Sequence, residues 1–472
     1  MSTVYLAIDI GASSGRHIVS FVENGTVKTQ EVYRFSNGAA LKDGHLCWDR
    51  EGLFHHVLEG LKAAKDQGFT PAFIGIDTWA VDFVLLDEND RPLGDMVAYR
   101  DSRTEGMDAL LEKALPFSQH YAICGIAKQP FNTVYQLMAV LQEHPEYRKT
   151  AKDFLLVPEY LSFLLTGKKA HEWTNLSTTA LCDAQTKTFS PQILKAAHLP
   201  PQLFEGKIVP PGHSLGSLLP HIQKLVGYDA AVLLPATHDT GSAYMAVPAR
   251  DENAAFLSSG TWSLLGTELN TAVTGQHALS AGFTNEGGYG NNVRFLKNIM
   301  GMWMLQCIHK ETGAAFSFAR MADMAASSSY PYAIQATDNR FLAPEHMLSE
   351  VKQALQDAGH PAPETLSDVL RAVTVGLALC YRDAICEMEE ITGKHFTSLN
   401  IVGGGSQNAV LNQMTADVTG LPVYAGPTEG TALGNLAGQM IANGEFASLA
   451  DFRHALKHSF PITTFFPKEE ST

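Results

Sequence analysis

The sequence predicts an α/β protein made of two related domains, and three observations carry this prediction. The chain has 472 residues, more than the ~250–300 residues at which a single hydrophobic core stops growing. Its content of 45% hydrophobic and 18% charged residues provides apolar material for two cores. A pattern of apolar strand, small polar loop and apolar strand occurs near residue 10 and again near residue 260. We therefore expect one domain over 1–245 and a second over 246–472.

The first half begins with an apolar strand, VYLAIDIG, which a small polar loop connects to a second strand. Residues 23–25 (ENG) lie between apolar runs and predict a hairpin turn, because Asn-Gly readily adopts the left-handed backbone of two-residue turns. Apolar side chains at helical spacing predict a helix over 51–68. Two further amphipathic runs predict helices over 133–145 and 157–166.

The second half repeats the opening pattern in FLSSGTWSLLG, which we interpret as a weak internal repeat of LAIDIGASSGRHIVS. Apolar positions at helical spacing predict a long helix over 364–392. LNIVGGGSQNAVLNQM then predicts a strand, a glycine turn and a helix, and PVYAG predicts a further strand. Only the end of the chain, PKEEST, has the composition of a disordered segment.

Charge and cysteine content narrow the class of protein. The net charge of −15 argues against nucleic acid or an anionic membrane as a main partner. No run approaches the roughly 20 apolar residues of a membrane span, and the start lacks the pattern of a signal peptide. The six cysteines form no CxxC pair, so we expect buried thiols rather than disulfides or a metal site. We expect a cytoplasmic monomer or small homo-oligomer that acts on a small molecule.

The loop in LAIDIGASSGR has the composition of a phosphate site, because small side chains let backbone N–H groups approach a phosphate. These small residues are Ala12, Ser13, Ser14 and Gly15. Asp9 at the end of the strand is suited to hold Mg²⁺, directly or through water, and Arg16 is suited to balance phosphate charge. A plain β-hairpin with a small-residue turn is the alternative interpretation.

Two further small-residue segments lie in the second half. FLSSGTWSLLG carries Thr261, and a second such loop suits a nucleotide bound by both domains. Gly403, Gly404 and Gly405 separate a strand from a helix, and glycines let the backbone lie flat against a planar or ribosyl group. This turn lacks the GxGxxG and GxxxxGK[ST] spacings, and a tight strand–helix turn is the alternative.

THDTGSA places Asp239 at an expected helix N-terminus, where the helix dipole favours an ionised carboxylate. In a cleft, such a carboxylate is suited to accept a sugar hydroxyl proton during phosphate transfer. From this segment alone, an ordinary N-cap is the better interpretation, because Asp is a preferred N-cap residue. The neighbouring His238 has a similar ambiguity.

Three polar segments offer contacts for a polyhydroxylated ligand. GIDTWAVDF carries Trp79 and Asp82 after an apolar strand, and YRDSR carries Arg100 and Arg103. A structural ion pair between Asp82 and either arginine is the alternative. FLKNIMGMWMLQ offers Asn298 at an expected helix start, where the plain role would be an N-cap.

Taken together and in this order, these segments resemble the FGGY family of carbohydrate kinases. The resemblance covers nearly the whole chain, and its most specific parts are DIGASSGR, GIDTWAVDF, VAYRDSR, THDTGSA, LSSGTWSL, LKNIMG and IVGGGSQN. It implies two actin-like (ribonuclease H-like) α/β domains with ATP in the cleft between them. The implied reaction is phosphorylation of L-rhamnulose at its 1-hydroxyl, which gives L-rhamnulose 1-phosphate and ADP in L-rhamnose degradation.

The resemblance also implies roles for individual residues, with Asp239 as the base. The implied contacts with ATP are Ala12, Ser13, Ser14, Gly15, Arg16, Thr261, Gln306, Gly403, Gly404 and Gly405. The implied contacts with the sugar are Ala80, His238, Asp239, Thr240 and Asn298. The family pattern GIDTWGVDF has glycine where this chain has Ala80, and this departure leaves the exact ketose open.

Three other functions remain open at this point. A kinase for another ketose, such as L-fuculose or a ketopentose, would share most of these segments. An actin-like filament protein or chaperone-type ATPase would share the fold but would not need THDTGSA with GIDTWAVDF. An inactive sugar sensor would not need to keep Asp9, Asp239 and both phosphate loops. We therefore expect a sugar kinase that uses ATP and Mg²⁺.

Overall fold

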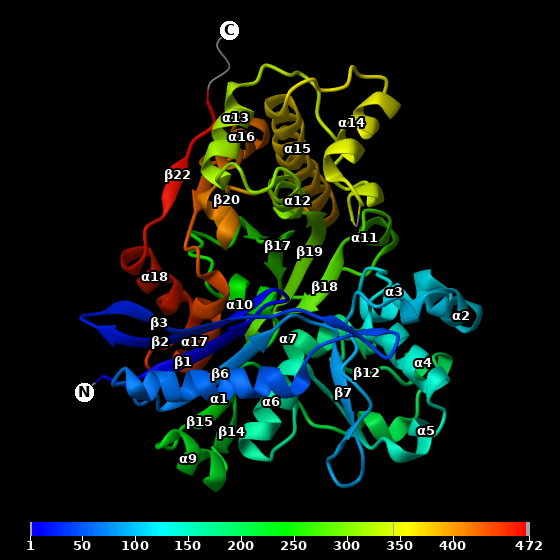
Figure 1. Cartoon of the computed structure of the whole chain (residues 1–472), viewed down its shortest axis with the longest axis vertical. Coiled ribbons are helices and arrows are strands. Elements are labelled where there is room, and N and C mark those ends of the chain that lie inside the picture. Colours follow the sequence, from blue (N-terminus) through cyan, green and yellow to red (C-terminus); the bar gives the residue numbers. More distant parts are fainter. Residues whose placement is uncertain (1, 343, 469–472) are drawn as a thin grey trace. The chain divides into compact units, whose positions relative to one another are not determined.

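The computed structural model describes residues 2–342 and 344–468, which form two compact units (Figure 1). Unit 1 comprises the described residues of Met1–Ala246, Glu268–Phe295 and Thr431–Ser459. Unit 2 comprises those of Val247–Thr267, Leu296–Gly430 and Phe460–Thr472. A single boundary cannot reproduce this division, so the ranges 1–245 and 246–472 stay a prediction about the sequence.

Unit 1 contains the first strands and most of the short helices. Its strands are β1 (Tyr5–Ile10), β2 (Ser14–Glu23), β3 (Thr26–Ser36), β4 (Ala40–Lys42), β5 (His45–Cys47), β6 (Phe73–Thr78), β7 (Phe83–Leu86), β8 (Pro92–Leu93), β9 (Asp153–Leu156), β10 (His171–Glu172), β11 (Cys182–Asp183), β12 (Thr188–Phe189), β13 (Ile208–Val209), β14 (His213–Ser217), β15 (Ala231–Leu234) and β18 (Thr284–Gly287). Its α-helices are α1 (Arg50–Asp66), α2 (Met107–Ala114), α3 (Phe117–Cys124), α4 (Thr133–Glu143), α5 (Tyr147–Thr150), α6 (Val157–Thr166), α7 (Trp173–Leu176), α8 (Pro191–Ala196), α9 (Pro220–Val226), α10 (Asp239–Met245), α11 (Gln276–Ser280) and α18 (Leu449–Ser459), with most of α17 (Gly430–Ala442).

The main sheet of unit 1 has six strands in the order β14-β15-β6-β1-β2-β3. β1 pairs antiparallel with β2 and parallel with β6. Asp9 near the end of β1 is the register partner of Asp77 near the end of β6. Because parallel strands end at the same edge of a sheet, both carboxylates lie at that edge. The hairpin turn predicted at 23–25 is confirmed, since Asn24 and Gly25 have φ of 51° and 74°.

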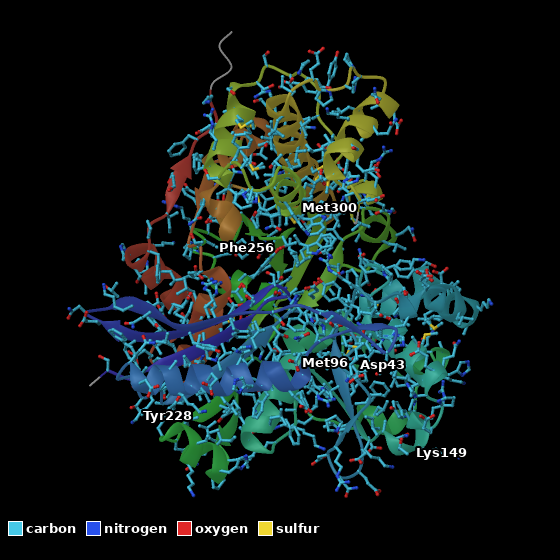
Figure 2. The ribbon with its side chains drawn as sticks, in the orientation of Figure 1. Asp43, Met96, Lys149, Tyr228, Phe256 and Met300 are labelled. Carbon is cyan, nitrogen blue, oxygen red and sulfur yellow. The ribbon has the colours of Figure 1, made fainter. Side chains whose placement is uncertain are left out.

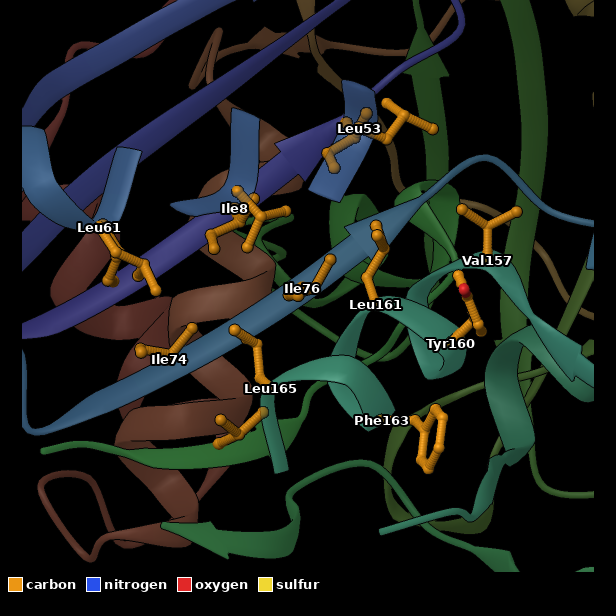
Figure 3. Close-up of a cluster of buried hydrophobic side chains, with 14 of the residues drawn as sticks. Ile8, Leu53, Leu61, Ile74, Ile76, Val157, Tyr160, Leu161, Phe163 and Leu165 are labelled. Carbon is orange, nitrogen blue, oxygen red and sulfur yellow. The ribbon is translucent and has the colours of Figure 1, made fainter. Parts of the chain in front are cut away.

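Helices α1 and α6 cover one face of this sheet with their apolar sides. Figure 3 shows Leu61 of α1 and Leu161 of α6 close to Ile8 and Ile76 of the central strands. All four side chains are buried, and burial of one such side chain stabilises the fold by about 1.5–3 kcal/mol. This packing fixes β1 and β6, whose ends carry the carboxylates described below.

Unit 2 is built on the second predicted hairpin. Its strands are β16 (Ala254–Ser259), β20 (Ser398–Val402), β21 (Val423–Ala425) and β22 (Thr463–Phe465), with most of β17 (Trp262–Leu269) and β19 (Val293–Met300). Its α-helices are α12 (Trp303–Glu311), α13 (Phe318–Ser327), α14 (Met347–Asp357), α15 (Leu366–Thr392) and α16 (Ala409–Thr419). β16 pairs antiparallel with β17 and parallel with β20, which matches the pairing of β1 with β2 and β6. The internal repeat predicted from the sequence is therefore confirmed at the level of strand pairing.

The predicted long helices are also confirmed. The helices expected over 51–68, 133–145, 157–166 and 364–392 correspond to α1, α4, α6 and α15. Side chains such as Met96 and Tyr228 in unit 1 and Phe256 in unit 2 are buried, whereas those of Asp43 and Lys149 are exposed (Figure 2). These buried layers hold the loops that follow the strands in place.

The cysteines and the chain end complete the description. All six cysteines are free thiols; four of them are buried as predicted, whereas Cys307 is half-buried and Cys386 is exposed. Within 2–342 and 344–468, no helix combines the length and apolar character that crossing a membrane requires. The predicted disorder of PKEEST falls partly on residues 469–472, which lie outside the described residues.

Candidate active site

Two neighbouring carboxylates lie at the ends of β1 and β6 in unit 1. Asp9 Oδ2 accepts hydrogen bonds from Nε and Nη2 of Arg16 at 3.0 and 2.8 Å. Asp77 is buried, and its Oδ2 accepts a hydrogen bond from Asn435 Nδ2 at 2.6 Å. Burial, and then the nearby charge of Asp9, raise the pKa of Asp77 well above its usual range. Asp77 is therefore the member of the pair that favours its neutral form, while Asp9 is paired with an arginine.

The predicted phosphate loop joins β1 to β2. Gly11 N donates to Ser14 O at 2.9 Å, and this bond closes the loop. No hydrogen bond from the described part of the chain occupies the N–H groups of Ala12 and Ser13, so both are available to an anion. Gly15 lies in β2, where a Cβ atom would be only 2.1 Å from Cζ of Phe35. Packing on that ring, rather than a left-handed backbone, accounts for this glycine.

Asp239 is the first residue of α10, and His238 occupies the N-cap position before it. The N-cap role that the segment alone favoured for Asp239 is therefore wrong. Its Oδ1 accepts hydrogen bonds from Thr240 N at 2.6 Å and from Thr240 Oγ1 at 3.3 Å, and it lies 3.3 Å from His238 Nε2. No hydrogen bond from residues 2–342 or 344–468 reaches Oδ2 of Asp239, and the Asp239 side chain is 33% exposed. Asp239 thus presents one occupied and one open oxygen.

The charges around Asp239 act on its pKa in both directions. Burial raises this pKa, His238 opposes the rise, and Asp9 adds to it.

The backbone just before α10 is held by a β-type contact, because Thr78 N at the end of β6 donates to Thr237 O at 3.0 Å. The start of α10 and the end of β6 therefore lie together in unit 1.

Glu172 holds Thr237, just before α10, from a second direction, and this glutamate was not predicted from the sequence. Its Oε2 accepts hydrogen bonds from Thr237 N at 2.9 Å and from Thr237 Oγ1 at 2.8 Å. Its Oε1 accepts one from Thr174 N at 2.8 Å. Burial raises the pKa of Glu172 to about 6, although the hydrogen bonds from these donors act to lower it. No local pattern marked Glu172, because its partner Thr237 lies 65 positions away.

Asp82 organises the loop that follows β6. Its Oδ2 accepts hydrogen bonds from the indole N–H of Trp48 at 2.7 Å, the indole N–H of Trp79 at 2.9 Å and Tyr99 N at 3.1 Å. Its Oδ1 accepts one from Gln136 Nε2 at 3.0 Å. The two indole rings lie with centroids 4.2 Å apart. Protein donors thus occupy this carboxylate, so its contribution is to orient the aromatic pair.

The same loop contains the position where the sequence departs from the family pattern. The residue with a left-handed backbone is Val81, with φ of 70°, and Ala80 is not among the residues of positive φ. Alanine is therefore compatible with the backbone at position 80. A β-branched residue in this conformation is strained by about 1–3 kcal/mol. Thr133 Oγ1 and Gln136 Nε2 stabilise it by donating to Val81 O at 2.7 and 3.3 Å.

In unit 2, the glycine turn packs against the end of β16. A Cβ atom on Gly405 would lie 1.9 Å from Ser259 Oγ, and one on Gly403 would lie 2.8 Å from Ser259 O. Gly403 also has φ of 86°, which favours glycine. Gly404 is exposed, and a Cβ atom there would meet no atom within 4 Å. The turn therefore brings an open backbone surface next to the loop after β16.

That loop carries Thr261 and contacts the start of α12, the helix of Gln306. Met302 N donates to Gly260 O at 3.1 Å, and Trp303 N donates to Thr261 O at 3.1 Å. The structure thus brings together in unit 2 the predicted nucleotide contacts Thr261, Gln306 and the glycine turn. Asn298 was expected at a helix start, but it lies in β19 and α12 begins only at Trp303. The apolar positions of VRFLKNIM do not alternate, so the sequence alone did not reveal the strand, which forms by pairing with β17.

The donors present suit magnesium better than a metal that needs an all-protein cage. No group of three or more His, Cys, Asp or Glu in the described ranges is arranged to hold a metal ion. Mg²⁺ commonly keeps several waters and binds through one or two carboxylates and substrate phosphates. Asp9 is suited to supply one such carboxylate, because its side chain is 10% exposed and lies at the end of β1, beside the predicted phosphate loop.

Comparisons with known proteins identify the family. The N-terminal domain model of the FGGY family of carbohydrate kinases matches residues 4–246, and its C-terminal domain model matches residues 255–443. The chain is 45% identical to a rhamnulokinase of Halalkalibacterium halodurans, over 98% of each chain. It is 41% identical to a rhamnulokinase of Bacillus subtilis, over 99% of this chain and 96% of the relative.

Solved structures match the fold over the whole chain. Xylulose kinase from Lactobacillus acidophilus, with ligand bound, has a TM-score of 0.80 at 18% identity and covers 99% of this chain and 94% of its own. Plasmodium falciparum glycerol kinase with ADP has a TM-score of 0.80 at 17% identity, with the same coverage. These likenesses confirm the predicted actin-like α/β fold. The chain belongs to the FGGY family of carbohydrate kinases.

Proposed function

We propose that this kinase transfers the γ-phosphoryl group of ATP to the 1-hydroxyl of L-rhamnulose. The products are L-rhamnulose 1-phosphate and ADP, and the reaction is a step of L-rhamnose degradation. The observation that carries the proposal is the identity of 38–45% to several rhamnulokinases over about 98% of the chain. The geometry of unit 1 supports it, because an open carboxylate oxygen lies at the start of α10, close enough for the charge of Asp9 to act on it.

Asp239 is the proposed base. The sugar oxygen attacks the γ-phosphorus, the bond from that phosphorus to the β–γ bridging oxygen breaks, and the hydroxyl proton passes to Asp239 Oδ2. Oδ1 is occupied by Thr240, with His238 Nε2 3.3 Å away, so the carboxylate is held in one orientation. A positioned general base contributes about 10²–10⁴-fold to such a rate.

The proposed ATP contacts are the two small-residue loops and the glycine turn. Available N–H groups at Ala12 and Ser13 support the role of the first loop, together with Ser14, Gly15 and Arg16. In unit 2, the proposed contacts are Thr261, Gln306, Gly403, Gly404 and Gly405. Asp9 would hold Mg²⁺, which supplies positive charge to the phosphates when bound.

The proposed sugar contacts include the base itself. They are Trp79, Ala80, His238, Asp239, Thr240 and Asn298. Asp82 contributes by positioning Trp79, because protein donors occupy both of its oxygens. The reaction consumes ATP, which supports the cytoplasmic location predicted from the sequence.

A panel of ketoses tests the substrate. ADP release is measured with L-rhamnulose, L-fuculose and the ketopentoses at equal concentrations, and kcat/KM is compared. We expect the highest value for L-rhamnulose. A higher value for L-fuculose or a ketopentose would assign the enzyme to that sugar. Turnover of ATP that no sugar changes would instead indicate an actin-like ATPase.

A further inference from the structure

A buried ion pair lies behind His238, on the side of the imidazole opposite Asp239. Arg294 Nη2 lies 3.1 Å from Glu286 Oε2, and the Arg294 side chain has no exposed surface. Arg294 Nε also donates to Gly287 O at 2.8 Å. Burial of a charged group is costly unless it is paired and hydrogen-bonded. A fully buried arginine in the run VRFL, in contact with His238, therefore needs a structural reason.

The imidazole of His238 bridges this ion pair and Asp239. Its Nδ1 lies 3.1 Å from Arg294 Nη2, and its Nε2 lies 3.3 Å from Asp239 Oδ1. Guanidinium nitrogens only donate hydrogen bonds. Nδ1 must therefore accept from Arg294, and it carries no proton in this contact. The proton of the neutral ring is then on Nε2, directed at Asp239.

The other tautomer fits the same contacts poorly. An Nδ1–H group would reach Glu286 Oε2 only at 3.4 Å, while facing the guanidinium N–H of Arg294 at 3.1 Å. It would also leave the lone pair of Nε2 against the carboxylate of Asp239. A doubly protonated ring would donate from Nε2 to Asp239, but its Nδ1–H group would still face the guanidinium N–H of Arg294. The geometry thus selects the neutral Nε2–H form.

We propose that Arg294 is a positioning residue that fixes the Nε2–H tautomer of His238, so that His238 donates to Oδ1 of Asp239 and leaves Oδ2 for the sugar hydroxyl. Glu286 balances the charge of the buried guanidinium. Burial opposes ionisation of Glu286, yet the pKa of Glu286 is lowered overall, with the charge of Arg294 as the main opposing cause. The catalytic consequence rests on the proposed role of Asp239, whereas the tautomer itself does not depend on which sugar is used.

The tautomer of His238 in the wild-type enzyme is measured directly by long-range ¹H–¹⁵N NMR of protein labelled with ¹⁵N-histidine. His238→Gln identifies the signal by its disappearance. We expect an unprotonated Nδ1 and a protonated Nε2 in the enzyme without sugar. A protonated Nδ1 overturns the proposal. Because this experiment needs no turnover, it stays decisive if L-rhamnulose proves not to be the substrate.

Two variants separate Arg294 from its counter-ion. Arg294→Met removes the donor to Nδ1, and we expect a mixture of tautomers and a kcat lower by about 10–100-fold, with little change in KM for ATP. Glu286→Gln keeps that donor, and we expect the Nε2–H tautomer to persist. An unchanged tautomer in Arg294→Met, or a switched one in Glu286→Gln, overturns the proposal. If Arg294→Met does not fold, as thermal unfolding will show, the wild-type and Glu286→Gln spectra decide.

Discussion

The hairpin β1–β2 of unit 1 and the hairpin β16–β17 of unit 2 share their strand pairing but differ in charge. In unit 1, Asp9 pairs across the hairpin with Arg16 and lies in register with Asp77 on the parallel neighbour. At the corresponding register in unit 2, Ser258 pairs with Leu264 and lies in register with Val402. At this register, the same backbone arrangement therefore carries ionisable groups in one unit and none in the other.

This difference shows how a repeated fold divides the work of a phosphotransferase. The charged hairpin lies in the unit that also holds Asp239, where we propose a metal ion and a base. The hairpin of unit 2 packs against the glycine turn, where we propose that backbone groups bind the nucleotide. The comparison predicts that substitutions of the carboxylates in unit 1 mainly change kcat, whereas those of the small residues near the glycine turn in unit 2 mainly change KM for ATP.

The largest effect is expected from Asp239→Asn. The amide keeps an oxygen for Thr240 but no longer accepts a proton, so kcat should fall by ~10²–10⁴-fold. Calorimetric binding of ATP should be nearly unchanged. Asp66→Asn, on the exposed side of α1, is the control and should retain full activity. Near-normal turnover of Asp239→Asn would contradict its role as the base.

Asp9→Asn and Thr261→Val test the two hairpins against each other. Loss of the Asp9 charge should lower kcat by about 10²–10³-fold, because the electrostatic stabilisation of the transferring phosphoryl group is weakened. Thr261→Val removes a neutral hydrogen-bonding group, worth about 1 kcal/mol, and should raise KM for ATP by roughly fivefold. Steady-state kinetics at varied Mg²⁺ measures both. Equal effects on kcat would remove the proposed division between the units.

We expect a buried histidine of unit 1 to make the free energy of unfolding depend on pH. His17 of β2 is buried, and burial lowers its pKa to about 3. Between this pKa and its ordinary value, the unfolded chain binds more protons than the native one, so the free energy of unfolding falls as the pH falls. The loss between pH 7 and pH 5 should be about 2 kcal/mol for this residue.

Urea denaturation at both pH values measures this loss, and His17→Met should remove it. His55→Gln is the control, because His55 is exposed on α1. A loss of stability that is the same in the wild type and in His17→Met would show that His17 is not the acid-sensitive group of the hairpin.

A matched pair in the glycine turn of unit 2 tests the packing on Ser259. A methyl group on Gly405 would meet Ser259 Oγ at 1.9 Å, whereas one on Gly404 would meet no atom within 4 Å. Overpacking of this kind costs ~1–3 kcal/mol. Gly405→Ala should therefore raise KM for ATP by about tenfold, while Gly404→Ala changes it much less. The reverse order would mean that the packing on Ser259 does not position the turn.

Local patterns predicted the parts of the fold that depend on neighbouring residues. The turn at 23–25 and the helix over 157–166 follow from turn chemistry and helical periodicity, and the structure has both. Asn298 was misplaced because the apolar positions of its segment do not alternate, so the sequence alone did not reveal the strand. Asp239 was correctly placed at a helix start, although its N-cap role was not.

Contacts between distant residues were beyond sequence reasoning. The carboxylate of Asp82 binds Trp48, 34 positions away, and Arg294 contacts His238, 56 positions away. No local pattern brings such residues together, since the sheet and its packing decide the pairing. The organisation of the aromatic pair and of the imidazole therefore required the three-dimensional structure.

One competition experiment tests the central claim most directly. The enzyme is given ATP, Mg²⁺ and equal amounts of L-rhamnulose and L-fuculose, and the sugar phosphates are resolved by ³¹P and ¹H NMR. We predict that L-rhamnulose 1-phosphate is the main product, with phosphorus coupled to the protons on carbon 1. A main product that is another sugar phosphate, or phosphate on another carbon, would contradict the account.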